Sequence, residues 1–160
     1  MTGGGHLATI SLYYDGCSTG DADLMRRTLA DDVVHWFLAP NPGSAPVRGG
    51  EHLARYWRKV HGLIDAVWIV DHLLDGATEA VIEWTMYWTP LESGLRVSTR
   101  GAEWFAFAAD GRIAEIRSYY SQHPDRDSEL AGFPYPDRGY SRHGAERSRI
   151  HTPSSKEPQP

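Results

Sequence analysis

Four segments typical of β-strands follow one another along the second half of the chain, and they constrain its fold most. Each combines β-branched and aromatic residues and is bounded by polar or turn-forming residues. The segments are "AVWIVDHLL" (66–74), "EAVIEWTMYW" (79–88), "RVSTRGAEWFAFA" (96–108) and "RIAEIRSYYSQH" (112–123). Because short turns such as Asp110-Gly111 separate them, we predict an antiparallel meander in which each strand pairs with the next.

Helical spacing of apolar residues dominates the first half. Residues 6–18 show it first, and Gly20-Asp21 then supplies a C-terminal glycine and an N-cap for a second helix over 22–31. A short strand is predicted at "VVHWF" (33–37), followed by the turn-rich loop "APNPGSAPVRGG" (39–50). A third helix follows, where apolar residues recur at i, i+3, i+4, i+7 and i+11: Leu53, Tyr56, Trp57, Val60 and Ile64. Three helices and a sheet make an α+β fold, with the helices covering one face of the sheet.

The length of the chain predicts one domain. Its 160 residues, 41% of them hydrophobic, provide for a single core. We assign residues 1–140 to this domain, with a core over about 5–123 and a C-terminal extension over 124–140 that folds over the body. Residues 141–160 are polar, charged and Pro-rich, which predicts a disordered tail.

Charge and cysteine content argue against several classes of function. The formal charge is -5, and the first 137 residues carry 11 basic against 19 acidic side chains, which argues against nucleic acid as a partner. Cys17 is the single cysteine, so the chain forms no internal disulfide and fits a reducing compartment. No apolar run is long enough for a membrane segment and no secretion signal precedes the first helix, so we expect a cytoplasmic protein. No metal-binding His pattern occurs, and neither metal nor cofactor is expected.

The order and spacing of these elements resemble the nuclear transport factor 2-like superfamily, especially its SnoaL-like branch, which includes polyketide cyclases and ketosteroid isomerase-like proteins. The stretches that carry the resemblance are "LYYDGCSTGDADLMRRTLADDVVHW", "GGEHLARYW" and "DGRIAEIRSYYS", within about residues 5–123. The resemblance implies a cone-shaped α+β barrel, in which three N-terminal helices pack on a curved antiparallel β-sheet around a cavity. Its clearest marks are turn residues such as Gly20-Asp21, which report the fold rather than the chemistry.

One carboxylate lies in an apolar run. In "TRGAEWFAF" (99–107), strand alternation places Glu103 on the same face as Phe105 and Phe107, and that face should be buried. A carboxylate there is costly unless it is paired or protonated. One solution is a structural ion pair with Arg100, Arg117 or another arginine.

The resemblance implies the other solution for Glu103. When ketosteroid-isomerase-like members are laid on this chain, Tyr13 falls on their oxyanion-binding tyrosine and Glu103 on the protonated acid that shares the oxyanion. Helical periodicity adds a caution, because Tyr14 rather than Tyr13 lies on the apolar stripe of the first helix. Both tyrosines are inside if that helix is buried nearly all round.

The general base is less clear from the sequence. The isomerases' base Asp corresponds to Phe37, so isomerisation lacks its central residue. His35 shares the face of Phe37 and is the candidate base, with a histidine bonded to backbone at the pocket rim as the alternative. Ser118 stands where epoxide hydrolases of the superfamily have an Asp. SnoaL-like cyclases place an acid/base side chain in the same cavity, and the candidates are Asp71, His72, Glu83 and His123.

These residues predict a cofactor-independent acid/base enzyme for a small apolar oxygenated molecule: a cyclase, isomerase, dehydratase or ring-opening hydrolase, in secondary metabolism. Tyr13, Glu103 and His35 are the predicted catalytic residues. Predicted ligand contacts are Tyr14, Phe37, Tyr56, Trp57, Phe105, Ser118 and Tyr120. The alternative is a non-catalytic small-molecule-binding or dimeric interaction module of the same fold. Because residues 79–88 are hydrophobic on both faces, we also expect a homodimer through the β-sheet.

Overall fold

The computed structural model describes residues 5–151, and its three α-helices lie close to where the sequence predicts them. They are α1 (Gly5–Thr19), α2 (Ala22–Thr28) and α3 (Gly50–Ile64). At the joint between α1 and α2, Gly20 has a φ of 73°, in the left-handed region that glycine adopts without steric cost. The carboxylate of Asp21 accepts a hydrogen bond from the backbone N–H of Leu24 at 2.9 Å and so caps α2.

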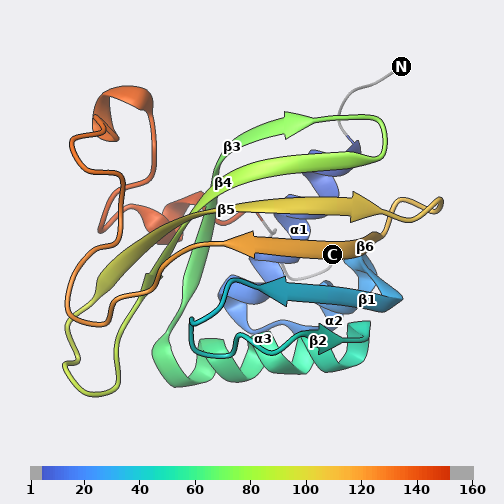
Figure 1. Ribbon diagram of the computed structural model, residues 1–160, viewed down its shortest axis with the longest axis horizontal. Coiled ribbons are helices and arrows are strands. Elements are labelled where there is room, and N and C mark those ends of the chain that lie inside the picture. The colour runs from blue at the N-terminus through green and yellow to red at the C-terminus, as the bar shows by residue number, and fades with distance from the viewer. Residues whose placement is uncertain (1–4, 152–160) are drawn as a thin grey trace, which may run out of the picture.

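Across residues 5–151, six strands form one sheet (Figure 1). They are β1 (Leu29–Phe37), β2 (Val47–Arg48), β3 (Val67–Asp75), β4 (Glu79–Trp88), β5 (Val97–Phe107) and β6 (Ile113–Tyr119). Their order across the sheet is β2-β1-β6-β5-β4-β3. Strands β3 to β6 form the predicted antiparallel meander, while β1 pairs with β6 in parallel. The expected α+β arrangement of three helices on a curved sheet is confirmed.

Two local boundaries differ from the predictions. The helix predicted over 22–31 ends at Thr28, because Leu29 already pairs with Ile113 of β6. Strand β1 therefore begins before the predicted segment 33–37. The turn-rich loop after β1 also contains a two-residue edge strand, β2, which pairs antiparallel with β1.

The helices cover the concave face of the sheet, and the core lies between the two layers. Figure 1 shows α1 and α2 behind the sheet and α3 along its lower edge. Ile10 of α1, Leu53 of α3 and Phe105 of β5 belong to this core and have no exposed surface. Strand β5 alternates as predicted, since Phe105 is buried whereas Trp104 is 40% exposed. This alternation fixes Glu103 on the concave face.

A β-bulge in β3 changes the face on which one candidate residue, His72, lies. The pairing with β4 shifts register between Val70 and His72, so Asp71 is the extra residue. The side chain of Asp71 is fully buried on the outer face, whereas His72 is exposed and pairs in register with Glu83. Simple alternation groups His72 with Trp68, which lies on the cavity face, and the bulge separates the two.

Residues 124–151, which we call the C-terminal segment, pack on the outer face of the sheet and contain the short 3₁₀ helices η1 (Pro136–Arg138) and η2 (Glu146–Arg149). Ser128 pairs in register with Thr99 of β5. Further along, the backbone N–H of Ser141 donates to Asp71 at 2.7 Å, and the Tyr87 hydroxyl donates to Ser141 Oγ at 2.9 Å. The outer side of β3 and β4 is thus covered by the chain itself.

The predicted disordered tail begins too early in the sequence. Within residues 141–151, Glu146 is 5% exposed and accepts a hydrogen bond from Arg96 at 3.0 Å. Ile150 packs against a second small cluster of buried residues on β3 and β4. Composition missed this packing because it depends on a few polar contacts and one apolar anchor rather than on a periodic pattern. Residues 152–160 of the predicted tail lie outside the described residues.

Candidate functional site

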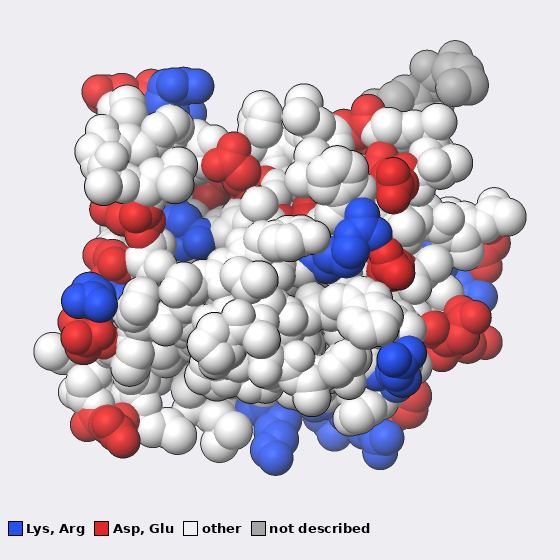
Figure 2. Space-filling view, viewed as in Figure 1, with Lys and Arg blue, Asp and Glu red and all other residues white. Residues whose placement is uncertain are grey.

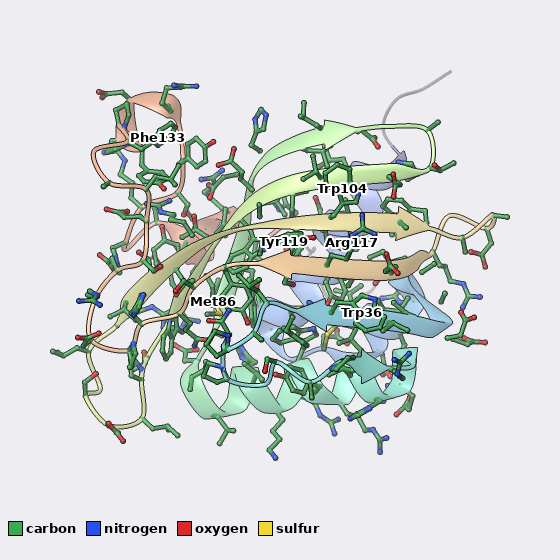
Figure 3. All side chains as sticks on the ribbon, viewed as in Figure 1. Trp36, Met86, Trp104, Arg117, Tyr119 and Phe133 are labelled. Atoms are coloured by element: carbon green, nitrogen blue, oxygen red, sulfur yellow. The ribbon has the colours of Figure 1, made fainter. Side chains whose placement is uncertain are left out.

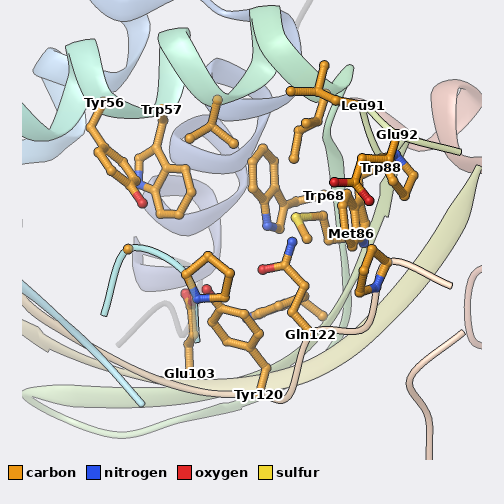
Figure 4. A pocket seen from close by; sticks show the side chains of 17 residues that line it. Tyr56, Trp57, Trp68, Met86, Trp88, Leu91, Glu92, Glu103, Tyr120 and Gln122 are labelled. Atoms are coloured by element: carbon orange, nitrogen blue, oxygen red, sulfur yellow. The ribbon is translucent and has the colours of Figure 1, made fainter. Parts of the chain in front are cut away.

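A cavity of about 450 Å³ lies between α3 and the concave face of the sheet (Figure 4). Most of its lining side chains are apolar or aromatic. From α3 come Tyr56, Trp57, Val60 and Ile64; from β3 and β4, Trp68, Trp84, Met86 and Trp88; from the following loop, Pro90, Leu91 and Glu92; from β5, Glu103; and from loops and the end of β6, Pro42, Gly43, Tyr120, Gln122 and Pro124. Its size is typical of small-molecule sites.

A glycine in β5 makes room for one wall of the cavity. Gly101 pairs in register with Trp84 of β4. A Cβ atom at Gly101 would lie 2.6 Å from the Trp84 indole, closer than any real side-chain contact. The missing side chain therefore lets Trp84 lie across the neighbouring strand, where its ring meets that of Tyr120 at a centroid distance of 5.3 Å.

Glu103 is the buried acid of this cavity. It lines the cavity from the sheet side, and 3% of its surface is exposed. Tyr14 of α1 donates a hydrogen bond to Oε2, and Ser118 of β6 donates one to Oε1 at 2.6 Å. Burial raises the pKa of Glu103 from 4.5 to about 8, and the Ser118 hydrogen bond offsets this in part. The carboxyl is therefore mostly protonated at neutral pH.

The structural ion pair considered for Glu103 does not form with either arginine. Arg100 lies on the outer face, 3.5 Å from Glu129 of the C-terminal segment. Arg117 pairs with Glu115 of its own strand. The acid is therefore held by neutral hydroxyl groups and by no positive charge.

His35 is linked to Glu103 through Ser118. The imidazole is 1% exposed, its Nε2 lies 2.5 Å from Ser118 Oγ, and its ring stacks on Phe37 at 4.1 Å, as their shared face predicts. Because Ser118 gives its hydrogen to Glu103, Nε2 supplies the hydrogen in the bond with Ser118. Desolvation lowers the pKa of His35 from 6.5 to about 3, so the ring is neutral at pH 7. The alternative of a histidine bonded to backbone is not observed.

The hydroxyl that reaches Glu103 belongs to Tyr14, whereas the resemblance points to Tyr13. Both side chains are buried, which confirms that the face of α1 toward the core is wide. The Tyr13 hydroxyl has no hydrogen-bond partner among the described residues, and Tyr13 does not line the cavity. Consecutive helical residues point about 100° apart, and Tyr14 shares its stripe with Ile10 and Cys17. Periodicity therefore identifies the contacting tyrosine better than the alignment does.

The predicted ligand contacts divide into two layers. Tyr56, Trp57 and Tyr120 line the cavity directly. The other four predicted contacts are not among its lining residues and lie one layer behind: Tyr14, Phe37, Phe105 and Ser118. Tyr14 and Ser118 bind the lining acid, while Phe37 packs on Tyr56 and Trp57.

The four further acid/base candidates do not line the cavity. Asp71 lies on the outer face, as alternation from Val70 expects, and the β3 bulge places His72 on that face as well. Glu83 lies on that face too, where it accepts a hydrogen bond from Tyr140 at 2.9 Å. His123 contacts Ser121 instead, at 3.3 Å.

Several lining residues were not singled out as ligand contacts from the sequence. Trp84, Met86 and Trp88 alternate along one face of β4, and this pattern was sufficient to find them. Gln122 shares the face of Tyr120 at the end of β6. Glu92 lies in an irregular loop, where no periodic signal could have identified it.

Residues 5–151 contain neither a membrane-spanning helix nor a metal-binding cluster. No helix there is long and apolar enough to cross a membrane. No group of three or more His, Cys, Asp or Glu side chains in that range is placed to hold a metal ion.

The family of the chain follows from residues 10–116, which match the model of the SnoaL-like domain. This match covers more than half of the sequence. The chain belongs to the SnoaL-like family. Among curated proteins, none matches the sequence.

Solved structures of other proteins share the nuclear transport factor 2-like fold of this SnoaL-like domain. A Methylobium petroleophilum PM1 protein of unknown function with a cystatin-like fold is 29% identical, with 99% of each chain covered and a TM-score of 0.67. A putative polyketide cyclase from Xanthomonas campestris is 21% identical, with 73% of this chain and 90% of that one covered and a TM-score of 0.60. RV0760c from Mycobacterium tuberculosis, solved with estradiol-17β-hemisuccinate, is 15% identical over 73% of this chain and 94% of its own, with a TM-score of 0.62.

Proposed function

We propose that this SnoaL-like protein is a cofactor-independent enzyme that acts as a general acid. It donates a proton to a small, largely apolar, oxygenated molecule. The observation that carries the proposal is Glu103, a buried carboxyl with a raised pKa that faces an aromatic cavity. Perturbed acids of this kind are typical of catalytic sites. Tyr14 and Ser118 hold the carboxyl in place from two different elements.

The hydrogen bonds around Glu103 explain how it would act. Its two oxygens accept from Tyr14 and Ser118, and in the protonated state its own O–H remains to donate to a substrate oxygen in the cavity. When the proton moves to that oxygen, the resulting carboxylate keeps both hydrogen bonds, which stabilise its new charge. General acid catalysis of this kind contributes roughly 10²- to 10⁴-fold to a rate.

The surroundings of Glu103 favour cyclisation, dehydration or ring opening over isomerisation. Phe37 occupies the position of the isomerases' base, and a phenyl ring accepts no proton. His35 does not line the cavity, and its bond to Ser118 makes it a positioning residue that orients the acid from behind. The three favoured reactions need a proton delivered to an oxygen, which Glu103 can provide.

The relatives support a small-molecule substrate. The Mycobacterium tuberculosis protein was solved with a steroid ester, and the Xanthomonas campestris protein is described as a putative polyketide cyclase. We therefore propose a polycyclic or polyketide-like substrate in secondary metabolism. We place the enzyme in the cytoplasm, as fits the free, buried thiol of Cys17.

Native mass spectrometry of the purified protein, followed by incubation of any retained molecule with the protein, would test this function.

Glu103→Gln removes the transferable proton and should reduce turnover about 10²- to 10⁴-fold while ligand binding persists. Tyr14→Phe should reduce turnover roughly 10- to 10³-fold. Tyr13→Phe is the matched control and should leave turnover nearly unchanged. Turnover that survives Glu103→Gln would contradict the proposal.

A non-catalytic ligand-binding or interaction module is the second candidate. It is favoured by Phe37 in place of the familiar base, and by a cavity whose titratable lining groups are two tyrosines and two glutamates. A retained molecule that binds tightly and is never converted would support this candidate instead.

We also propose that two copies associate through the part of the outer sheet face that the C-terminal segment leaves open. Trp36, Trp104 and Tyr119 lie there, on β1, β5 and β6, and are 38%, 40% and 53% exposed (Figure 3). Exposed aromatic groups on a sheet face are typical of protein interfaces.

A further inference from the structure

The ionisable lining groups of the cavity that can carry charge near neutral pH are both carboxyl groups, and because Glu103 is mostly protonated there, the charge comes from Glu92. Glu92 and Glu103 are its two carboxyl groups, and no Lys, Arg or His is among its lining residues. Figure 4 shows the two glutamates on opposite sides of the cavity, with Glu92 beside Trp88 and Glu103 beside Tyr120. Glu92 lies in an exposed loop and forms no ion pair within the described part of the chain. A ligand therefore meets an uncompensated negative charge at the rim.

The walls between the two glutamates are aromatic. Six rings contribute: Tyr56, Trp57, Trp68, Trp84, Trp88 and Tyr120. The faces of such rings attract cations, and indole does so most strongly. The negative faces of the same rings do not attract anions. An apolar ligand body with a positive charge at one end suits this lining, whereas a carboxylate over the ring faces or beside Glu92 would be repelled.

The charge of the whole chain acts in the same direction. The full sequence carries 16 basic against 21 acidic side chains, a formal net charge of -5 at pH 7. The summed field of such a body raises the local concentration of cations near its clefts and lowers that of anions. The lining charges, the aromatic walls and the body charge are three separate observations that agree.

We propose that the ligand of this cavity carries a basic amine, protonated at neutral pH, which lies at the rim near Glu92 while its apolar body contacts the aromatic walls. The inference rests on the proposed function in one respect: the ligand also carries an oxygen that faces Glu103. It names the substrate class: an aminated aromatic or polycyclic molecule with an oxygen at its far end. Acidic molecules of the same shape should bind more weakly, because Glu92 repels them.

Calorimetric titration with three probes of one shape tests the charge preference. The probes are 2-naphthylmethylamine, 2-naphthylmethanol and 2-naphthoate, which at pH 7 are cationic, neutral and anionic. The amine should bind tightest, and at least about tenfold tighter than the carboxylate, since like charges in a cleft cost more than about 1.4 kcal/mol. Added salt should narrow this difference.

Two variants assign the preference to the cavity rim. Glu92→Gln should weaken the amine about two- to fivefold and leave the neutral alcohol unchanged, as expected for a partly exposed charge pair. Asp137→Asn, on exposed η1 away from the cavity, removes the same charge and should change neither affinity. A carboxylate that binds as well as the amine, or a Glu92→Gln variant that keeps the full preference, would overturn the inference. Either result leaves the proposed acid catalysis standing, because only turnover by Glu103→Gln decides that.

Discussion

At the scale of single residues, the burial of Glu103 without a cation lowers the stability of the fold and also keeps the carboxyl protonated for the site. Its neighbours on the concave face are apolar or hydroxyl groups, and no cation compensates its charge. Folding therefore takes up a proton that the unfolded chain releases above pH 4.5. The substitution Glu103→Gln would keep a similar side-chain shape and hydrogen-bonding capacity without this penalty.

This proton uptake predicts an unusual dependence of stability on pH. Below pH 4.5, Glu103 is protonated in both states and contributes no slope. Between pH 4.5 and about 8 the unfolded carboxyl is ionised and the folded one is not, so the free energy of unfolding should fall by up to about 1.4 kcal/mol per pH unit. Above that range the loss levels off. Urea unfolding of the wild type and of Glu103→Gln at pH 5 and pH 8 measures this change in the free energy of unfolding.

The difference between the two proteins is the informative quantity. His35, whose pKa is lowered to about 3, adds a slope of the opposite sign between there and pH 6.5, and this slope is common to both. The variant should therefore gain stability relative to the wild type as pH rises. Parallel pH profiles for the two proteins would show that Glu103 ionises normally in the folded state.

At the scale of elements, the sequence predicts those features that repeat and misses those that occur once. The period of α3 and the alternation of β5 identified the elements and placed Glu103 on the buried face. By contrast, α1 is buried on several sides, so periodicity and alignment disagreed about Tyr13 and Tyr14. The bulge at Asp71 is a single backbone irregularity that no alternation reveals, and it moved His72 to the outer face.

The pairing of Gly101 with Trp84 predicts that one methyl group will deform the cavity wall. In Gly101→Ala the new Cβ would overlap the Trp84 indole, so the ring must move into the cavity or the strands must separate. We expect a loss of about 1–3 kcal/mol in stability and weaker ligand binding. Gly62→Ala is the matched control, because nothing lies within 4 Å of its added Cβ and alanine favours the helix by up to about 1 kcal/mol. Equal thermal stabilities for the two variants would contradict this account of the wall.

At the scale of the whole molecule, the C-terminal segment takes the place that a partner was predicted to fill on β4. Asp71 anchors it, since its carboxylate accepts hydrogen bonds from Ser141 N–H at 2.7 Å and from Arg149 at 3.2 Å. Asp71→Ala should cost about 1–3 kcal/mol and speed hydrogen exchange over 141–149 without changing cavity affinity. Asp75→Ala, which removes a less buried partner of His6 on the same strand, should cost under about 1 kcal/mol. Unchanged exchange in Asp71→Ala would mean that the segment is held by other contacts.

The open remainder of the outer face makes a specific prediction about assembly. Arg117 pairs in register with Trp36 on one side and with Trp104 on the other, and its guanidinium lies 5.6 Å from the centre of the Trp104 ring. The three side chains thus form a row across β1, β6 and β5, and Figure 2 shows mostly uncharged side chains across the middle of this face. In the proposed dimer, a two-fold contact would set this row against its own copy and bury the tryptophans.

Sedimentation equilibrium should therefore give twice the chain mass of 17.9 kDa for the wild type. Trp104→Glu places a charge at the centre of the contact and should shift the protein to the monomer, because a buried charge without a partner opposes association. Leu63→Glu makes a comparable change at a 52% exposed position on α3, away from the outer face of the sheet, and should leave the dimer intact. A wild type that sediments as a monomer at high concentration would contradict the proposed dimer. The exposed tryptophans would then have no structural explanation in the chain.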